Sequence, residues 1–260
     1  MRVVSLGSGS SGNGFLLDTG EVALLIDCGV AVRACQSAIR DLGVADRLAG
    51  IVVSHEHIDH VRSIPSITRK LDIPLITTIG THGALRTTLR LDRRAAGERY
   101  SNGSLEVTFF GVSHDAAEPC GFVAEHDGTR VAVFTDLGHV SQAVLEAIAS
   151  ADIVVLEANY DRQMLMQGPY PAHLKRRIQG PAGHLGNDDC ATALAATVSD
   201  RTQAIWLAHL SDKNNLPDIA IGTVREAIAL MGYDAPVNAL PRFERAEITR
   251  VPARQLQFGL

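Results

Sequence analysis

Short apolar runs alternate with segments of helical spacing through the first quarter of the chain. Apolar runs of strand length predict β-strands at residues 2–7, 14–20, 22–29 and 50–55. The spacing of apolar positions predicts helices at residues 31–42 and 60–71. Gly43 follows the first of these helices, and Pro74 stands just beyond the second, as expected at helix ends.

The same alternation continues to the end of the chain. Residues 121–136 predict a hairpin, because two alternating runs meet at Asp127-Gly128, a dipeptide typical of two-residue turns. Further strands are predicted at residues 105–114, 152–159, 204–211 and 246–251. Further helices are predicted at residues 140–149, 187–199 and 217–231, the second of them with Asn187 and Asp188 placed to cap its start.

Strands therefore come before the central helices and again after them. This order predicts layers of sheet covered by helices. The chain contains no internal repeat, low-complexity tract or obvious linker. We therefore predict one domain over residues 1–260.

Composition places the protein among ordinary globular proteins, with 46% hydrophobic and 20% charged residues in 260. The four cysteines are far apart in sequence and form no CxxC pair, so a reducing, cytoplasmic compartment is expected. The N-terminal apolar run is too short for a signal peptide, and no run approaches a membrane span.

The net charge of −5 counts against a non-specific coat on nucleic acid but allows a local basic patch. Arg86, Arg90, Arg93 and Arg94 would share one face of a helix, where a solvated surface is the slightly better interpretation. Residues 175–177 are all basic and lie in a segment, 161–183, that is rich in Gly and Pro. That segment resembles a lid or a substrate loop.

The stretch SHEHIDH, residues 54–60, is the strongest chemical signal in the chain. His55 and His57 lie two apart at the end of a predicted strand, so in extended backbone they point the same way. Asp59 and His60 could join them through a turn from strand to helix. Imidazole and carboxylate are common ligands of divalent ions, so the HxHxDH pattern predicts a metal site.

Three more candidate ligands each follow an apolar run at the point where a loop begins. His114, Asp136 and His209 end the runs LEVTFFGVSH, RVAVFTD and AIWLAH. Active-site residues often occupy such loops because a rigid scaffold holds them in place. Each residue alone could be an ordinary loop or capping residue, but the shared placement favours a common site.

With these motifs the chain resembles the metallo-β-lactamase fold superfamily, from Val3 to about His209. The opening SLGSGSSGNG, with SHEHIDH and GHLGN, resembles its narrower WalJ/YycJ/VicX-like branch. The resemblance implies a four-layer αββα sandwich with a two-metal site in the cleft at the sheet edges. It implies the following ligands: His55, His57 and His114 for one ion, Asp59, His60 and His209 for the other, and Asp136 bridging, with Glu56 and Ile58 pointing away.

Two features favour phosphodiesters as substrates. The ligand set with Asp136 and His209 resembles that of ribonuclease Z and nuclease branches, although glyoxalase-type thioesterases share it. His184, just before a predicted helix, resembles the histidine that contacts the scissile phosphate in ribonuclease Z-like enzymes. We interpret His184 as a general acid or phosphate contact, the alternative being a loop histidine that caps its neighbour. The branch usually has Ser at the positions of Gly14 and Gly186.

The Gly/Ser loop at residues 7–13 does not fit a dinucleotide-binding fingerprint, because no GxGxxG precedes a helix. Its backbone N–H groups and hydroxyls could line the cleft, and Asn13 is the candidate substrate contact. A flexible turn is an equally good interpretation.

The sequence thus predicts a cytoplasmic hydrolase with two Zn or Mn ions, in which Asp59 and His184 are candidate catalytic residues. The branch resemblance implies a 5′→3′ exonuclease on DNA. A phosphodiesterase for small cyclic or nucleotide substrates is the first alternative. A thioesterase or lactonase is the second, and a regulatory protein with structural metals the third. The sequence does not define the oligomeric state.

Overall fold

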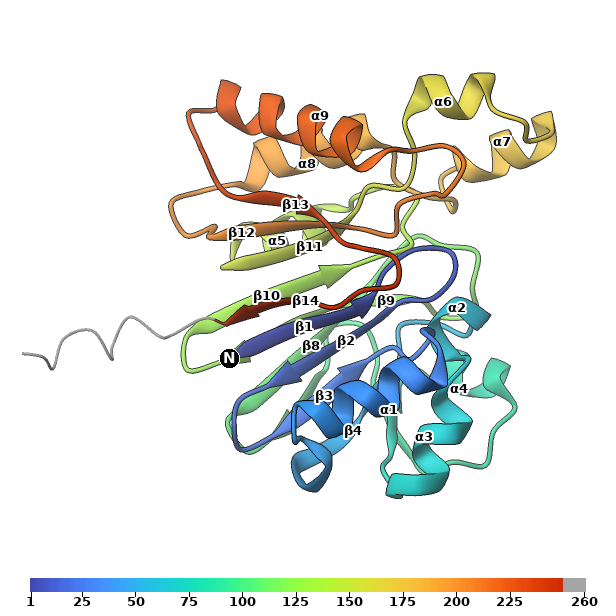
Figure 1. Cartoon of the computed structure of the whole chain (residues 1–260), viewed down its shortest axis with the longest axis vertical. Helices are drawn as coiled ribbons and strands as arrows, with labels where there is room; N and C mark the ends of the chain where they lie inside the picture. Colours follow the sequence, from blue (N-terminus) through green and yellow to red (C-terminus); the bar gives the residue numbers. More distant parts are fainter. Residues whose placement is uncertain (250–260) are drawn as a thin grey trace, which may run out of the picture.

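The computed structural model describes residues 1–249, which form two seven-stranded sheets packed face to face (Figure 1). The first sheet contains, in order, β14 (Ala246–Thr249), β1 (Arg2–Gly7), β2 (Gly14–Asp18), β3 (Ala23–Ile26), β4 (Leu48–Val52), β5 (Leu75–Thr77) and β6 (Leu91–Arg93). The second contains β13 (Val237–Ala239), β12 (Ala204–Ala208), β11 (Ile153–Glu157), β10 (Thr129–Phe134), β9 (Cys120–His126), β8 (Leu105–Gly111) and β7 (Arg99–Asn102).

Helices cover the outer face of each sheet. The first sheet carries α1 (Val32–Asp41), α3 (Ile64–Leu71) and α4 (Ile79–Leu85), with α2 (Ile58–Val61) and a 3₁₀ turn (Ala45–Arg47) in its connections. The second carries α5 (Gln142–Ala149), α8 (Asn187–Thr197) and α9 (Pro217–Leu230). Two short helices, α6 (Arg162–Gln167) and α7 (Ala172–Ile178), stand beside these layers (Figure 1). The predicted four-layer αββα sandwich is confirmed.

Three apolar clusters hold the four layers together, one at each interface. Alternate residues of a strand face opposite sides of its sheet. In β3, Leu24 and Ile26 therefore pack between the sheets, while Leu25 packs under the helices. The central strands are apolar on both faces, which explains their continuous apolar runs. Full burial of each such side chain contributes roughly 1.5–3 kcal/mol.

The hairpin of β9 and β10 forms where the sequence predicts it. Asp127 and Gly128 both have positive φ, 48° and 72°, and His126 pairs with Thr129 across them. A two-residue turn with positive φ at both positions matches the twist of the flanking strands. Strand β10 begins at this turn and ends at Phe134, two residues before Asp136.

Two local predictions need correction. The helix predicted at residues 60–71 is two helices, α2 and α3. At the break between them the Ser63 N–H donates to the Cys28 carbonyl oxygen at 2.8 Å, and the Ser63 hydroxyl donates to that of Val30 at 2.6 Å. Helix α8 begins after Gly186 without a side-chain cap. The Asn187 side chain instead exchanges hydrogen bonds with Asn215.

The predicted basic helix face of Arg86 to Arg94 is wrong. Helix α4 ends at Leu85, and Arg86 adopts a left-handed conformation with φ of 48°. Arg93 then lies in β6. A run of arginines spaced four, three and one apart cannot share one helix face once the helix has ended before them.

Some sequence predictions remain open. Strand β14 is described as far as Thr249, so residues 250 and 251 of the predicted last strand lie outside the described residues. Among the described residues no helix is long and apolar enough to cross a membrane. The single domain over residues 1–260 stays a prediction.

The four cysteines are free thiols, and folding brings the sulfurs of Cys28 and Cys35 to 3.1 Å.

A tight backbone contact joins the loop after β3 to helix α2. The Cys28 N–H donates to the His60 carbonyl oxygen at 2.6 Å, and the Asn13 N–H donates to that of Asp59 at 2.7 Å. A Cβ atom on Gly29 would lie only 1.6 Å from the Asp59 carbonyl oxygen. Only glycine therefore allows the two segments to approach so closely.

We predict that Gly29→Ala lowers the free energy of unfolding by about 3 kcal/mol or more, because the new methyl group overlaps backbone. Urea denaturation monitored by circular dichroism would measure it. Gly222→Ala is the matched control, since a Cβ there meets nothing within 4 Å inside α9. That change should stabilise the helix by up to about 1 kcal/mol. An unchanged midpoint for Gly29→Ala would contradict the packing argument.

Candidate metal centre

The histidines and carboxylates singled out in the sequence meet where strands of both sheets end. Strands β1 and β10 both run toward the side of the molecule on which α2 and α7 lie (Figure 1). Loops after β4 and β8 supply one group of side chains there, and helix α2 with the loops after β10 and β12 supplies another. Segments from both sheets must therefore be in place before the site exists.

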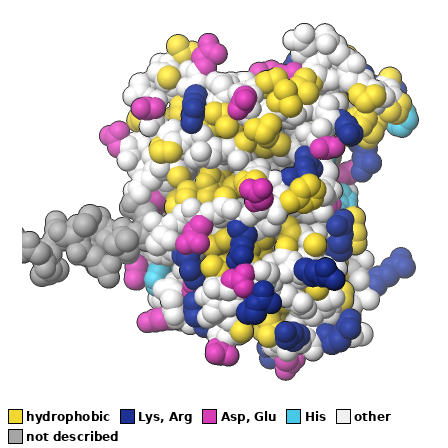
Figure 2. All heavy atoms as spheres, in the orientation of Figure 1, with side chains coloured by type: hydrophobic (Ala, Val, Ile, Leu, Met, Phe, Trp, Pro, Cys, Tyr) yellow, Lys and Arg dark blue, Asp and Glu magenta, His cyan; other side chains and the backbone are white. Residues whose placement is uncertain are grey.

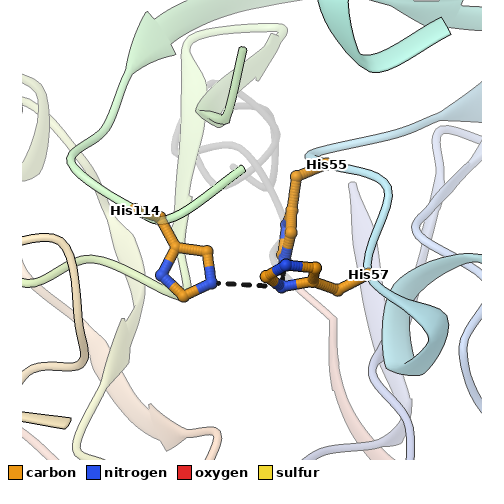
Figure 3. Close-up of side chains that lie close together, drawn as sticks. All are labelled: His55, His57 and His114. Atoms are coloured by element: carbon orange, nitrogen blue, oxygen red, sulfur yellow. Dashed lines mark hydrogen bonds between the residues drawn. The ribbon is translucent and has the colours of Figure 1, made fainter. Parts of the chain in front are cut away.

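Three imidazoles form the first group. His55 and His57 come from the loop after β4, and His114 approaches from the loop after β8 on the other side (Figure 3). Nδ1 of His57 lies 3.1 Å from Nε2 of His55 and 3.3 Å from Nε2 of His114. The three ring nitrogens thus converge on one point.

The second group combines two histidines with two carboxylates. Asp59 Oδ2 lies 3.7 Å from Nε2 of His60 and 3.4 Å from Nε2 of His209. Asp136 lies between the rings, with Oδ2 3.0 Å from Nε2 of His60 and Oδ1 3.0 Å from Nδ1 of His209. Oδ1 of Asp136 is also 3.9 Å from Nε2 of His114, so this carboxylate faces both groups.

Buried carboxylates hold the outer nitrogen of two of these rings. Nδ1 of His60 donates to Oδ2 of Asp27 at 2.7 Å, and Nδ1 of His209 donates to Oε1 of Glu157 at 2.9 Å. An ionised carboxylate accepts hydrogen bonds only, so Nδ1 carries a proton in both rings. Nε2 is then the nitrogen that faces the cluster in both rings, and in His60 it also lies 3.1 Å from the Asn13 side-chain nitrogen.

The first group is held in the same way by neutral acceptors. The Ser54 hydroxyl donates to Oδ2 of Asp27 at 2.8 Å and so accepts from Nδ1 of His55 at 3.0 Å. Nδ1 of His114 donates to the Gly183 carbonyl oxygen at 3.0 Å. His55 and His114 therefore also present Nε2 toward the cluster. His57 differs, because its Nδ1 points inward.

Burial and charge separate the two groups electrostatically. Burial lowers the pKa of His55 well below its ordinary value and also lowers the pKa of His114, which keeps both rings neutral. Burial alone would lower the pKa of His60 too, but the Asp136 and Asp27 carboxylates outweigh it and raise that pKa to about 10. The pKa of His209 is raised for the same reason, chiefly by Asp136 against the opposing effect of burial.

Four carboxylates, those of Asp27, Asp59, Asp136 and Glu157, surround the two histidines of the second group and favour positive charge there. Within the described residues, Oδ2 of Asp136 and Nε2 of His209 are buried without a hydrogen-bond partner. Buried polar atoms are normally paired, so these two atoms require an explanation. A divalent cation would satisfy both, and neutral imidazole with carboxylate is a donor set that such ions prefer. The residues present thus fit a metal centre.

Three residues of the site adopt left-handed backbone conformations. Asp27, Asp136 and His209 have φ of 55°, 57° and 55°, and each directly follows or nearly follows the end of a strand. This conformation costs a non-glycine residue roughly 1–3 kcal/mol. The turn it produces swings each side chain from the strand direction into the cluster.

His184 and Asn13 occupy different positions from the proposed ligands. Nδ1 of His184 donates to Oε1 of Glu157 at 2.8 Å and lies 3.5 Å from Oδ1 of Asp136, at the edge of the open cavity. Burial lowers the pKa of His184, but Glu157 outweighs it, so the pKa is raised. Asn13 is fully buried, and its side chain bonds to Gly9 and to Nε2 of His60.

The polar atoms of Asn13 are thus engaged inside the protein, and its role as a substrate contact stays a prediction. Ser10, from the same loop, lines the cavity instead. Glu56 accepts from the Ala117 N–H at 2.8 Å, and Ile58 is 64% exposed. Both point away from the cluster, as the family resemblance implies.

Two carboxylates of the site, Asp27 and Glu157, were not among the residues predicted from the sequence. Both are almost fully buried, and each connects two or more site residues. Glu157 also accepts from the backbone N–H groups of Leu137 and Leu185. Each carboxylate ends an otherwise apolar strand, the same signal that marked Asp136, so the sequence could have identified them.

A cavity of about 290 Å³ opens over the cluster. One part of its wall is polar, formed by His184 and five of the proposed ligands, His57, Asp59, His114, Asp136 and His209. Another part comes from α7 and the loop before it. The remaining lining residues are Ser10, Asp115, Asn159, Tyr170, Leu174, Arg177, Ile178, Gly183 and Ser211.

An αββα sandwich with clustered histidines and aspartates at the sheet edges is the architecture of metallo-β-lactamase fold proteins. Residues 23–209 match the family model described as beta-lactamase superfamily domain, so the chain belongs to that superfamily. Together with the donor groups, this membership indicates a divalent-metal centre.

The resemblance to the WalJ/YycJ-like branch is also confirmed. The chain is 36% identical over 236 residues to a Bacillus anthracis protein named exodeoxyribonuclease YycJ, covering 88% of this chain and 89% of that protein. It is 33% identical over 233 residues to exodeoxyribonuclease WalJ of Streptococcus pneumoniae, covering 86% and 87%. The metallo-beta-lactamase fold protein YhfI from Bacillus subtilis superposes with a TM-score of 0.73 at 16% identity, covering 95% and 99%.

We predict that Glu157→Gln weakens binding of a divalent ion at the His209 side by about 10- to 100-fold, because the carboxylate orients that ring. Binding at the His55, His57 and His114 group should be retained. Titration calorimetry with zinc and with manganese would resolve the two sites. Glu125→Gln, on the surface of β9, is the control and should leave both affinities unchanged. Equal loss at both sites would show that Glu157 supports the fold instead of one ring.

Proposed function

We propose that the protein is a metal-dependent phosphodiesterase that removes nucleotides from DNA, an exodeoxyribonuclease. One observation carries the proposal. Two groups of metal-binding side chains, from different strand ends, both lie close to the same buried carboxylate, that of Asp136. A structural metal site needs no such open, shared arrangement. The names of the relatives from Bacillus anthracis and Streptococcus pneumoniae support DNA as the substrate.

The proposal includes two divalent ions, zinc or manganese. His55, His57 and His114 would hold one, Asp59, His60 and His209 the other, and Asp136 would contact both. Bound there, two ions would act as Lewis acids toward the phosphate and lower the pKa of a shared water toward neutrality. With an ion bound, the neutral rings of the first group would leave its positive charge uncompensated, which would suit an anionic diester.

The chain's own residues position the substrate and handle protons. Glu157 fixes Nδ1 of His184 and so leaves Nε2 of that ring for the cavity. From there His184 would contact the phosphate or protonate the leaving oxygen. Asp59, with Oδ2 between His60 and His209, would orient the attacking water as well as bind metal. Both residues line the same open space.

A small diester, cyclic or nucleotide-sized, is the second candidate substrate. A cavity of about 290 Å³ and a net charge of −5 both favour a small ligand over a long polyanion. The two candidates differ in salt dependence, because each phosphate contact to a long strand releases counterions.

Two properties of the whole chain belong to the same proposal. The apolar cluster between the sheets is continuous, which supports a single domain. The cysteines are free thiols, which supports a reducing compartment, and we place the protein in the cytoplasm.

We predict that the protein loaded with zinc or manganese degrades end-labelled DNA with a steep loss of rate at high salt. The same sample should be offered RNA, bis(p-nitrophenyl) phosphate and a thioester. Asp59→Ala should abolish turnover together with ion binding at the His60 and His209 side. Salt-insensitive turnover of the small diester without DNA cleavage would favour the second candidate. Thioester turnover alone would refute both.

We predict that His184→Ala lowers kcat on DNA by about 10²-fold, the order expected for a lost general acid. Metal content, measured by mass spectrometry of the purified protein, should stay the same, since His184 is not a proposed ligand. The control is His173→Ala, a histidine on the exposed face of α7 that does not line the cavity. Loss of metal in His184→Ala would refute the assignment.

A further inference from the structure

Helices α6 and α7 form a small unit of their own, here called the cap (residues 161–183). Its apolar cluster contains Tyr160, Leu165 and Ile178, with Tyr170 and Leu174 packed against them. This cluster is separate from the three clusters of the sandwich. In Figure 1 the cap stands at one end of the second sheet, beyond α8 and α9. The cap therefore adds a surface to the site without being needed for the main core.

The cap gives the cavity two unlike walls. Five of the proposed ligands and His184 form a polar wall, whereas Tyr170 and Leu174 contribute a half-buried aromatic ring and an aliphatic side chain. Solvent-accessible apolar groups beside a polar cluster are typical of a binding site that orients its ligand. A phosphate has no apolar part, so this wall must face another part of the substrate.

The charge of the cap differs from that of the whole chain. It carries four cationic residues and one acidic residue, Asp161, although the net charge of the protein is −5. Three of the cations, residues 175–177, end helix α7. Basic side chains gather on the side of the molecule where α2 and α7 lie (Figure 2). Arg177 lines the cavity and donates from Nε to Asp115 at 2.8 Å, an exposed pair that a phosphate could replace.

We propose that Tyr170, backed by Leu174, is the stacking surface for the nucleobase next to the scissile phosphate, and that Arg177 contacts the adjoining phosphate. An aromatic ring beside basic residues is the combination that binds single-stranded nucleic acid without sequence preference. The inference rests on the proposed function, since it assumes that a nucleotide occupies the cavity. If the nucleobase stacks on Tyr170, the cap helps to determine the substrate, because an unpaired terminal nucleotide then binds better than a simple diester.

The test compares short single-stranded oligonucleotides that carry a base, or a tetrahydrofuran abasic residue, at the terminal nucleotide. Wild-type protein should prefer the base-bearing strand in kcat/KM by about 5- to 150-fold, the range measured for base–aromatic stacking. Tyr170→Ala should lose that preference and turn over both strands at the slower rate. Tyr170→Phe should keep the preference because the ring remains.

Phe243→Ala is the control, since this aromatic side chain is 78% exposed and lies outside the cavity. It should leave the preference unchanged. If Tyr170→Ala slows both strands equally, or if Phe243→Ala removes the preference, the inference is wrong. Either result would leave the proposed nuclease activity standing.

Binding to the same strands, followed by fluorescence anisotropy in an Asp59→Ala background, separates this inference from the proposed function. Base-dependent binding that disappears with Tyr170→Ala supports the stacking surface even if the wild-type protein cleaves no DNA. Equal affinity for base-bearing and abasic strands overturns it, whether or not cleavage occurs.

Discussion

The site depends on hydrogen bonds between buried carboxylates and the outer nitrogens of its histidines. Asp27 and Glu157 each accept from Nδ1 of a ring whose Nε2 then faces the cluster. Without those acceptors the rings could rotate or change tautomer, and the converging nitrogens would be lost. Asp27 also accepts a hydrogen bond from the Ser54 hydroxyl, which in turn accepts from Nδ1 of His55 in the first group. Two residues outside the proposed ligand set thus orient three of its five histidines.

The sandwich makes this arrangement possible because it brings strand ends from both sheets to one edge. The left-handed residues Asp27, Asp136 and His209 convert those ends into inward-pointing side chains. Their backbone cost is offset by the packing of the layers around them. The same edge leaves a cavity that α7 closes on one side. The strand ends of the two sheets therefore hold the residues of the metal centre, while the cap contributes cavity-lining residues that are not proposed ligands.

Apolar patterning predicted most central strands, the β9–β10 hairpin and the layer order, because buried strands have a strong local signal. The HxHxDH motif and three strand ends likewise identified the residues that the structure brings together. Residues whose roles depend on distant partners were misjudged. Asn187 bonds to Asn215 instead of capping α8. The arginines after Leu85 looked helical because spacing alone does not show where a helix ends.

The distance in sequence between the donors has a consequence for how the protein folds. His55 and His209 must meet at one site although the two strands that carry them lie in different sheets. Contacts between residues so far apart form late, after loop-closure entropy has been overcome. A metal ion cannot then nucleate folding, as it does in small zinc domains. It can bind tightly only to chains that have already assembled both sheets, so metal occupancy reports completed folding.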